Sequence, residues 1–394
     1  MVTIFLENKL FKSFKAEKVD LLVIAGEASG DEHAAHLVNK LLKRYPDLKI
    51  AVLGGENLQA TGAHFLFDLV EHAVVGVFEV LKNYSFFKSL FSHTLKWIHE
   101  HNPKAILLID YPGFNLRLAE ALRKEGLSNK GGGSIKVLQY ISPQLWAWKP
   151  KRRFKMAKVL DSLAVIFPFE VECYHDVSLP VSFVGHPFAE EDYFSPVKFD
   201  RDGSLLLLPG SRVQPIKRIL PVFLDAAEII IHSFPDLKIE IPVPNAQIKE
   251  CVEQIISTNS KLRDQILIPV NAKNVKARAA LMSSGTMSFT CALAGIPGVI
   301  AYRANPFTYW LGRLLIKVPY LGMANLLLPD NPPYQEFIQF EATAENLSKE
   351  IEGLLVNENQ SSSFSDSSKK LRSILQDPQE LEAFEWVATE SGIV

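Results

Sequence analysis

Cysteine is scarce in this chain of 394 residues, and the spacings that hold a zinc ion are missing. Its three cysteines, Cys173, Cys251 and Cys291, are far apart and form no Cys-x-x-Cys pair. An odd number at such distances argues against a disulfide scaffold and a structural zinc site, and it is typical of a reducing compartment. We therefore expect a cytoplasmic protein without a bound metal.

An excess of one charge is also lacking, since 42 Lys and Arg residues face 44 Asp and Glu residues. A surface built for nucleic acid would be basic, so we expect no nucleic-acid partner. The charge-free stretch at 279–302 carries several Ser and Thr and is broken at 295–298, which predicts a helix, a turn and a buried strand. The first residues lack the apolar core of a signal peptide. We expect no membrane-spanning segment.

Apolar runs alternate with amphipathic stretches, and 47% of the residues are hydrophobic. Such runs are typical of parallel strands covered by helices on both faces. The pattern predicts an α/β fold of two Rossmann-like doubly wound domains, with a ligand cleft between their strand ends. The runs lie at 19–25, 50–55, 105–110, 135–142 and 162–168, and again at 204–212, 237–243, 265–270 and 298–303.

The domain boundaries follow from polar and proline-containing stretches between these runs. We expect a first domain at 1–187 and a second at 200–358, joined by a hinge linker within 185–203. The serine-rich segment 359–370 predicts a flexible surface loop. A final helix within 370–394 would then pack back across the domains.

The motif "GEASGD" at 26–31 joins the first apolar run to a helical pattern. It lacks the third glycine of a dinucleotide fingerprint and the Gly-Lys-Ser/Thr ending of a Walker A loop. Acids at a helix start repel phosphate, so Glu27, Ser29 and Asp31 suit hydroxyls and amines. A simple helix cap by Ser29 or Asp31 explains the motif equally well.

Asp110 stands at the end of another apolar run, in "IDYPGFN". Catalytic groups gather at the carboxyl ends of strands in open α/β sheets, where one carboxylate can deprotonate an acceptor hydroxyl. Asn115 and Arg117 follow on the predicted helix. An Asx turn or a helix cap is the alternative reading of Asp110.

Two motifs in the second half suit a diphosphate. Gly210-Ser211-Arg212 and Ser284-Gly285-Thr286 each come between a strand-like run and a helix. Free amides at a helix N-terminus and a planar guanidinium both bind phosphate oxygens. Capped helices with a surface arginine are the alternative.

A basic run follows two tryptophans, Trp146 and Trp148, within residues 149–158. Aromatic and basic side chains together suit a membrane interface or a phosphorylated ligand, although a solvated helix face is also consistent. The apolar segments 83–98 and 305–329 could contact lipid as well, but such stripes more often belong to a core. The basic residues are Lys149, Lys151, Arg152, Arg153, Lys155 and Lys158.

Together these motifs resemble the lipid-A-disaccharide synthase family over nearly the whole chain. The matching pieces, in order, are "GEASGD", "GGENLQATG", "VVGVFEVL", "IDYPGFNLRLA", "YISPQLWAW", "PFE", "FVGHP", "LLPGSR", "SSGT", "YRANPFTYWLGRLLIK", "ANLL" and "QEFIQ". The resemblance implies a GT-B fold and an inverting hexosyltransferase of Gram-negative bacteria. It implies transfer from UDP-2,3-diacylglucosamine to 2,3-diacylglucosamine 1-phosphate, giving a β-1,6-linked disaccharide 1-phosphate and UDP.

The resemblance also implies roles for single residues, with no cofactor and no metal. The enzyme would be peripheral at the inner face of the inner membrane, and a homodimer is compatible with it. Asp110 would be the catalytic base. The donor would contact Gly210, Ser211, Arg212, Ser284, Gly285, Thr286, Tyr302, Asn325, Glu336 and Gln339, and the acceptor Glu27, Ser29, Asp31, Asn115 and Arg152.

Three positions depart from the family pattern. Thr290 replaces the glutamate that follows Ser-Gly-Thr in the family and is too short to bind both ribose hydroxyls. Gly113 replaces an acid, and Ala324 replaces a proline. These changes keep two alternatives open: a GT-B transferase or epimerase for another UDP-amino sugar, or a catalytically weakened lipid-binding member of the family.

Overall fold

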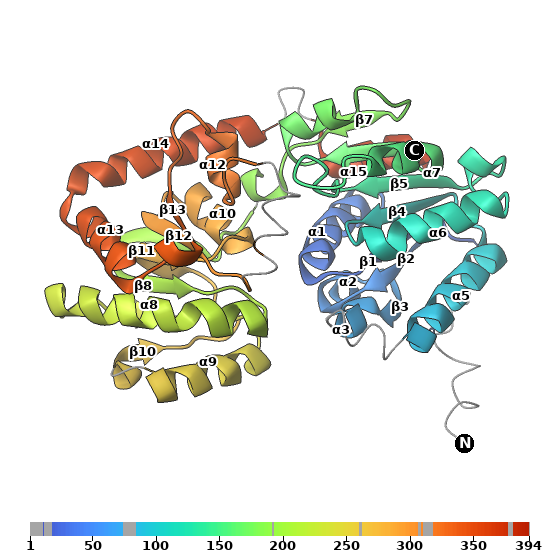
Figure 1. The fold of residues 1–394 in the computed structure, drawn as a ribbon. Coiled ribbons are helices and arrows are strands. Elements are labelled where there is room, and N and C mark those ends of the chain that lie inside the picture. The colour runs from blue at the N-terminus through green and yellow to red at the C-terminus, as the bar shows by residue number, and fades with distance from the viewer. Residues whose placement is uncertain are drawn as a thin grey trace, which may run out of the picture. The chain divides into compact units, whose positions relative to one another are not determined.

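The computed structural model describes residues 11, 18–73, 84–190, 193–259, 262–305, 309, 318–376 and 381–393. The chain divides into two compact units, one formed by residues 1–187 with 376–394 and the other by residues 188–375. Each unit is a parallel sheet with helices on its faces (Figure 1). Among the described helices, none combines the length and the apolar character needed to cross a membrane.

The first unit holds a seven-stranded parallel sheet in the order β3-β2-β1-β4-β5-β6-β7. Its strands are β1 (Leu21–Ala25), β2 (Ile50–Gly54), β3 (His64–Asp68), β4 (Ala105–Ile109), β5 (Lys136–Tyr140), β6 (Ser162–Val165) and β7 (Val181–Phe183). Its helices are α1 (Ala28–Arg44), α2 (Glu56–Ala60), α3 (Leu69–Ala73), α5 (Tyr84–His101), α6 (Pro112–Lys124), α7 (Arg152–Val159), the 3-10 helix η2 (Pro168–Tyr174) and α15 (Ala383–Ser391).

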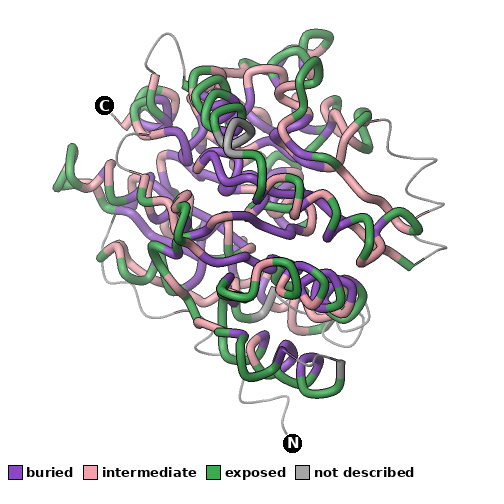
Figure 2. The backbone as a smooth tube through the Cα atoms, turned by 90° about the vertical axis from the view of Figure 1, so that its left-hand side faces the viewer, coloured by how far each residue is buried: buried purple, intermediate pink, exposed green. Residues whose placement is uncertain are grey.

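Both faces of this sheet are covered, which explains why its strands are continuous apolar runs. Leu22 and Ile24 of β1 share a core with α5, α6 and α7, while α1 and α15 pack together and contact the sheet. The stripe of α5 therefore belongs to the core, with Leu90, Trp97 and Ile98 buried. The central strands β1, β2 and β4 are buried along their whole length, and buried stretches of the chain are purple in Figure 2.

The second unit holds a six-stranded parallel sheet in the order β10-β9-β8-β11-β12-β13. Its strands are β8 (Val197–Leu208), β9 (Ile239–Glu240), β10 (Ile266–Leu267), β11 (Val275–Met282), β12 (Gly298–Tyr302) and β13 (Gln335–Ile338). Its helices are α8 (Val213–Ser233), α9 (Ala246–Asn259), α10 (Thr286–Leu293), α12 (Met323–Leu327), α13 (Ala344–Val356) and α14 (Glu358–Leu375).

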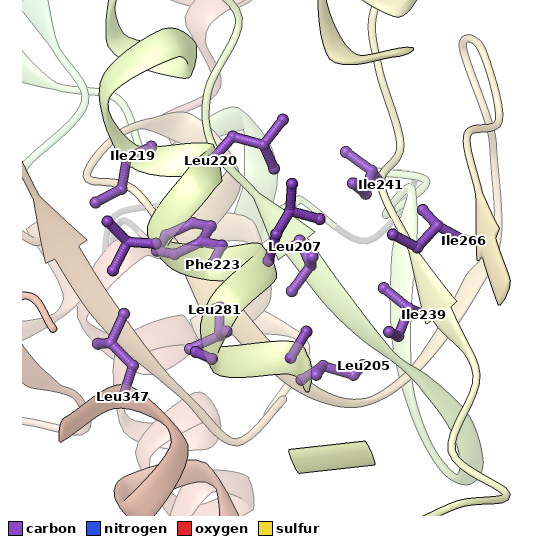
Figure 3. Packing of buried hydrophobic residues seen from close by; sticks show 14 of the residues in the cluster. Leu205, Leu207, Ile219, Leu220, Phe223, Ile239, Ile241, Ile266, Leu281 and Leu347 are labelled. Atoms are coloured by element: carbon purple, nitrogen blue, oxygen red, sulfur yellow. The ribbon is translucent and has the colours of Figure 1, made fainter. Parts of the chain in front are cut away.

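The core of this unit lies between its sheet and α8, α9 and α13. Phe223 of α8 lies among Leu207 and Leu281 of the sheet and Leu347 of α13 (Figure 3). The alternate strand residues, such as Leu206 and Met282, are also buried, as expected when helices cover both faces. Each of the nine predicted apolar runs overlaps a strand, so the α/β prediction is confirmed.

The structure corrects two predictions about the connections. The linker expected at 185–203 contains the boundary between the two units, at 187–188, but its second half is already the start of β8, where Val197 pairs with Val275 of β11. The serine-rich segment is not a loop but most of α14, because Phe364 and Leu371 are buried along one face. Small serines fit that face as well, and Ser368 Oγ donates to the Leu293 carbonyl at 2.6 Å.

The last helix, α15, returns to the first unit and lies against α1 and β5. Lys40 Nζ forms an ion pair with Glu382 at 2.7 Å, and Lys136 Nζ donates to the Glu390 carbonyl at 2.8 Å. Of the aromatic segment 305–329, residues 306–308 and 310–317 lie outside the described residues, and the whole "VVGVFEVL" piece lies outside them.

Candidate active site

The candidate acceptor half-site lies at the carboxyl edge of the first sheet. Glu27 follows β1, Asp110 follows β4, Trp146 follows β5 and Glu170 follows β6. Because β1, β4, β5 and β6 are neighbours and parallel, these residues leave the sheet at the same edge. This is where open α/β sheets bind ligands.

The backbone at Asp110 is strained. Asp110 and Tyr111 both have φ of 43°, in the left-handed region that side chains other than glycine disfavour, and Ile141 after β5 has φ of 70°. Such strain persists only where surrounding contacts hold it, and it gathers at functional sites. The Asn115 amide holds this turn by donating to the carbonyls of Ile109 at 3.2 Å and Asp110 at 2.8 Å.

Gly26 lets the two loops of this edge approach each other. A Cβ at Gly26 would overlap the ring of Tyr111, and one at Gly30 would lie 3.9 Å from the Cβ of Asp110. Gly26 is therefore required for close packing against the Asp110 turn, whereas a Cβ at Gly30 would make only ordinary van der Waals contacts. No phosphate cradle is needed to explain Gly26.

Asp110 has the protonation behaviour of a general base. Burial raises its pKa, the neighbouring carboxylate of Glu27 raises it further, and the amide of Tyr111 opposes both, giving a pKa of about 6. The group is therefore ionised at neutral pH and still basic enough to accept a proton.

Two residues predicted to contact the acceptor have supporting roles instead. Asp31 is buried, and its carboxylate accepts from the amides of Gly55 at 2.6 Å, Asn57 at 3.0 Å and Leu58 at 3.3 Å. Asn115 is fully buried and turned toward the backbone of Asp110. Asp31 thus fixes the turn between β2 and α2, whereas Glu27 and Ser29 remain partly exposed.

Asp31→Ala is expected to destabilise the first unit by about 2–3 kcal/mol, because three amides lose a charged acceptor. Asp31→Asn should cost less, since its amide oxygen still accepts. Urea unfolding followed by tryptophan fluorescence measures this, because Trp97, Trp146, Trp148 and Trp386 belong to this unit. Equal stability of Asp31→Ala and wild type would contradict the supporting role.

The candidate donor half-site lies at the carboxyl edge of the second sheet, between the neighbouring strands β8 and β11. α8 begins after Gly210-Ser211-Arg212, with Arg212 as its N-cap, and α10 begins at Thr286 with Gly285 as its N-cap. Two helix starts thus follow adjacent strands. Their first-turn amides have no acceptor within a helix and attract anions.

The two donor loops are in contact. Gly210 has φ of 106°, and a Cβ there would lie 3.2 Å from the hydroxyl oxygen of Ser283. Gly285 has φ of 154°, with open space where its Cβ would be. Arg212 and Thr286 are exposed, while Ser284 Oγ donates to the Leu321 carbonyl at 2.9 Å.

Three further donor candidates hold loops. Asn325 is fully buried; its amide donates to the Tyr334 carbonyl and to Glu336, each at 2.8 Å. The Glu336 carboxylate also accepts from the amides of Leu321 at 2.8 Å and Gly322 at 2.9 Å. Gln339 accepts from the Ala304 amide at 2.8 Å. These hydrogen bonds hold the loops at Leu321, Tyr334 and Ala304, and the role of the three residues in the donor pocket stays a prediction; Tyr302 ends β12 half-buried.

Thr290 is turned inward. It is 2% exposed, and its hydroxyl donates to the Thr286 carbonyl at 3.0 Å within α10. Thr290, which replaces the family glutamate, therefore forms a hydrogen bond within its own helix. Gly113 is exposed at the start of α6, so the missing acid there leaves no buried gap.

The sequence analysis missed Glu170, although it lies in the quoted "PFE" piece. Its carboxyl is 2% exposed and accepts from Trp146 Nε1 and from the Phe167 amide, each at 3.3 Å. Burial raises its pKa to about 8, these hydrogen bonds oppose the rise, and the charge of Asp110 adds to it. A buried acid next to a base is visible only once the strand order is known.

Two parallel α/β units, one with the carboxylate of Asp110 at its strand ends and one with paired helix N-termini, define an enzyme of the GT-B fold, the fold shared by glycosyltransferases and UDP-sugar epimerases. Solved structures agree at the level of fold. The glycotransferase of kitacinnamycin matches with a TM-score of 0.59 and 11% identity over 95% of this chain and 99% of that one. The UDP-GlcNAc 2-epimerase from Neisseria meningitidis, bound to UDP-GlcNAc, matches with a TM-score of 0.54 and 10% identity over 91% and 99%.

Sequence comparison narrows the class. The family model described as lipid-A-disaccharide synthetase matches residues 21–388. The lipid-A-disaccharide synthase of Nitrosococcus oceani is 37% identical over 84% of this chain and 86% of its own. Lipid-A-disaccharide synthase 1 of Legionella pneumophila strain Lens is 35% identical over 91% and 94%. The chain belongs to the lipid-A-disaccharide synthase family.

Proposed function

We propose that this enzyme transfers 2,3-diacylglucosamine from its UDP derivative to 2,3-diacylglucosamine 1-phosphate, forming the β-1,6-linked disaccharide 1-phosphate and UDP. The observation that carries the proposal is Asp110, a partly desolvated carboxylate with a pKa of about 6 at the edge of a sheet. The paired helix starts at Arg212 and Thr286 support an anionic donor.

The reaction is a single displacement. Asp110 takes the proton of the acceptor 6-hydroxyl while that oxygen attacks the anomeric carbon of the donor. The bond from this carbon to the diphosphate oxygen breaks on the opposite side, so the configuration inverts. Arg212 and the amides at the start of α10 stabilise the negative charge that develops on UDP. Both acyl sugars must react in one complex, since no covalent intermediate carries the sugar.

The transfer assay tests this function directly. Purified enzyme, without added metal, is given UDP-2,3-diacylglucosamine and 2,3-diacylglucosamine 1-phosphate in detergent micelles, and UDP and disaccharide are both measured. Equal amounts of the two products are expected. Conversion of a UDP-amino sugar to its epimer without UDP release would favour an epimerase. Lipid binding without turnover would favour a weakened family member.

We also propose that the enzyme works at the inner face of the inner membrane. An acyl chain of about a dozen carbons costs on the order of 10 kcal/mol to move into water, at ~0.8 kcal/mol per CH₂. Membrane contact is supported by an aromatic–basic patch made of Trp148, Lys149, Lys151, Arg152 and Phe154. Trp148 and Phe154 are each 43% exposed, and Lys149 Nζ lies 4.1 Å from the ring centre of Trp148. The expected homodimer stays a prediction.

The aromatic–basic patch borders the acceptor half-site. Trp148 lies two positions after Trp146, whose indole Nε1 donates to Glu170 of this half-site at 3.3 Å. A membrane bound here would leave the acyl chains of the acceptor in lipid. Lys155 and Arg153 are instead paired, with Glu120 at 2.6 Å and Asp176 at 2.5 Å, so their charges are largely compensated.

The double variant Lys149→Gln/Arg152→Gln is expected to bind vesicles of phosphatidylglycerol and phosphatidylethanolamine about 30-fold more weakly. Each basic residue near an anionic leaflet contributes ~1 kcal/mol, so two account for this factor. Sedimentation with the vesicles measures it. Lys43→Gln/Arg44→Gln is the matched control, because this pair also adjoins an aromatic residue, Tyr45, but lies at the far end of α1. Equal losses in both variants would contradict the patch.

A further inference from the structure

Glu170 is a buried acid without a basic partner. Among the residues that the structure describes, no lysine, arginine or histidine pairs with it, and its carboxyl accepts from the indole of Trp146 and from the backbone amides of Phe167 and Ile166. Aromatic rings surround the site: Phe167 stacks on Phe169 at 5.8 Å, and Trp146 meets Phe169 edge to face at 5.7 Å. An unpaired charge in such surroundings is costly, so the carboxyl keeps its proton.

Besides burial, Asp110 at the end of β4 is the charged group that raises the pKa of Glu170. Cys173 and Tyr174, in the same 3-10 helix, have raised pKa values and are neutral; Arg153 and Arg152 of α7 oppose those rises. His186, whose ring lies 5.2 Å from that of Phe167, has a lowered pKa because it is buried, so it is neutral as well. Burial raises the pKa of Asp110, and the charge of Glu27, next to the start of α1, raises it further. When the surroundings of two carboxyl groups give them different pKa values, one group stays protonated and the other is ionised. Here Asp110 is the ionised group.

We propose that Glu170 is a positioning residue of the transferase site, which in its protonated form fixes Trp146 and the segment after β6 and keeps a second negative charge away from Asp110. This rests on the proposed function, in which both substrates carry phosphate groups. An ionised Glu170 would repel them and would weaken the packing of Phe167 and Trp146. The enzyme should therefore lose activity when Glu170 is deprotonated.

The pH profile of kcat/KM tests the proposal. Wild type is expected to lose activity with a midpoint near pH 8, where the pKa of Glu170 lies, leaving roughly one-tenth at pH 9 by simple titration. Glu170→Gln keeps a neutral group and should not show this loss. The ratio of activity at pH 9 to that at pH 7 should thus be about tenfold higher in the variant, by the same titration argument. The same alkaline loss in both proteins would overturn the proposal.

Glu172→Gln is the matched control, since Glu172 lies in the same 3-10 helix with 83% of its side chain exposed. It should keep the wild-type alkaline loss. Glu170→Ala tests positioning, because it removes the acceptor for Trp146 and Phe167 and should lower kcat at every pH. Wild-type kcat in Glu170→Ala would overturn the positioning role.

A second readout separates this proposal from the proposed function. The pKa of Glu170 rises from 4.5 in the unfolded chain to about 8 in the folded protein, so its contribution to stability is complete at low pH and is lost progressively as pH rises to about 8. Wild type should therefore lose stability relative to Glu170→Gln from about pH 5 up to about pH 8 and level off above it, even if the transfer assay shows no turnover. In Asp110→Asn the charge beside Glu170 is gone, so the transition should move to lower pH. Absence of both effects would overturn the proposal.

Discussion

Replacing Asp110 with asparagine is expected to lower kcat by about 10³-fold, within the range for loss of a general base. Asparagine has the same size but cannot take the proton of the acceptor hydroxyl. The affinity for UDP should stay the same, because the donor residues belong to the other unit. The transfer assay measures the first quantity and titration calorimetry with UDP the second.

The pH profile adds an independent check on Asp110. Its pKa is about 6, so wild-type kcat/KM should fall below pH 6 as the carboxylate takes up a proton. The residual activity of Asp110→Asn should not show this acid limb. Asp47→Asn is the control, since Asp47 is an exposed acid in the turn before β2 and should behave as wild type. Full turnover by Asp110→Asn would show that another group is the base.

Arg212→Ala is expected to lower kcat/KM for the donor by about 10²-fold, as for loss of one charged donor to a developing anion. Its guanidinium stands at the start of α8, where its planar fork and the helix amides can bind diphosphate oxygens together. Arg212→Lys should recover only part of the loss, because an ammonium group cannot form the same paired hydrogen bonds. Donor kinetics and UDP calorimetry measure both variants.

Arg218→Ala is the matched control for Arg212, because it removes an exposed arginine from the second turn of the same helix. It should leave UDP affinity unchanged. Unchanged UDP affinity in Arg212→Ala as well would place the diphosphate elsewhere on this unit. The Ser284–Thr286 turn would then be the next position to change.

Contacts between distant segments decided the roles of several predicted site residues. Asp31 has the composition of a ligand-binding acid, yet its partners lie 24 to 27 positions further along the chain. Asn325 and Glu336 bind each other and the turn at Leu321 and Gly322. A polar residue in a loop looks the same in sequence whether it faces a ligand or a neighbouring amide, because only burial and partners distinguish the two.

The sequence by itself determined the parallel α/β architecture, since apolar runs covered on both faces are a local property of each strand. It also determined where Asp110 and the two Gly- and Ser-containing helix starts stand along the chain. Only the tertiary structure turned the serine-rich segment into a helix with one buried face and returned the last helix to the first unit. It also brought Glu170 beside Asp110, because strand order, and not separation along the chain, decides which residues share an edge of a sheet.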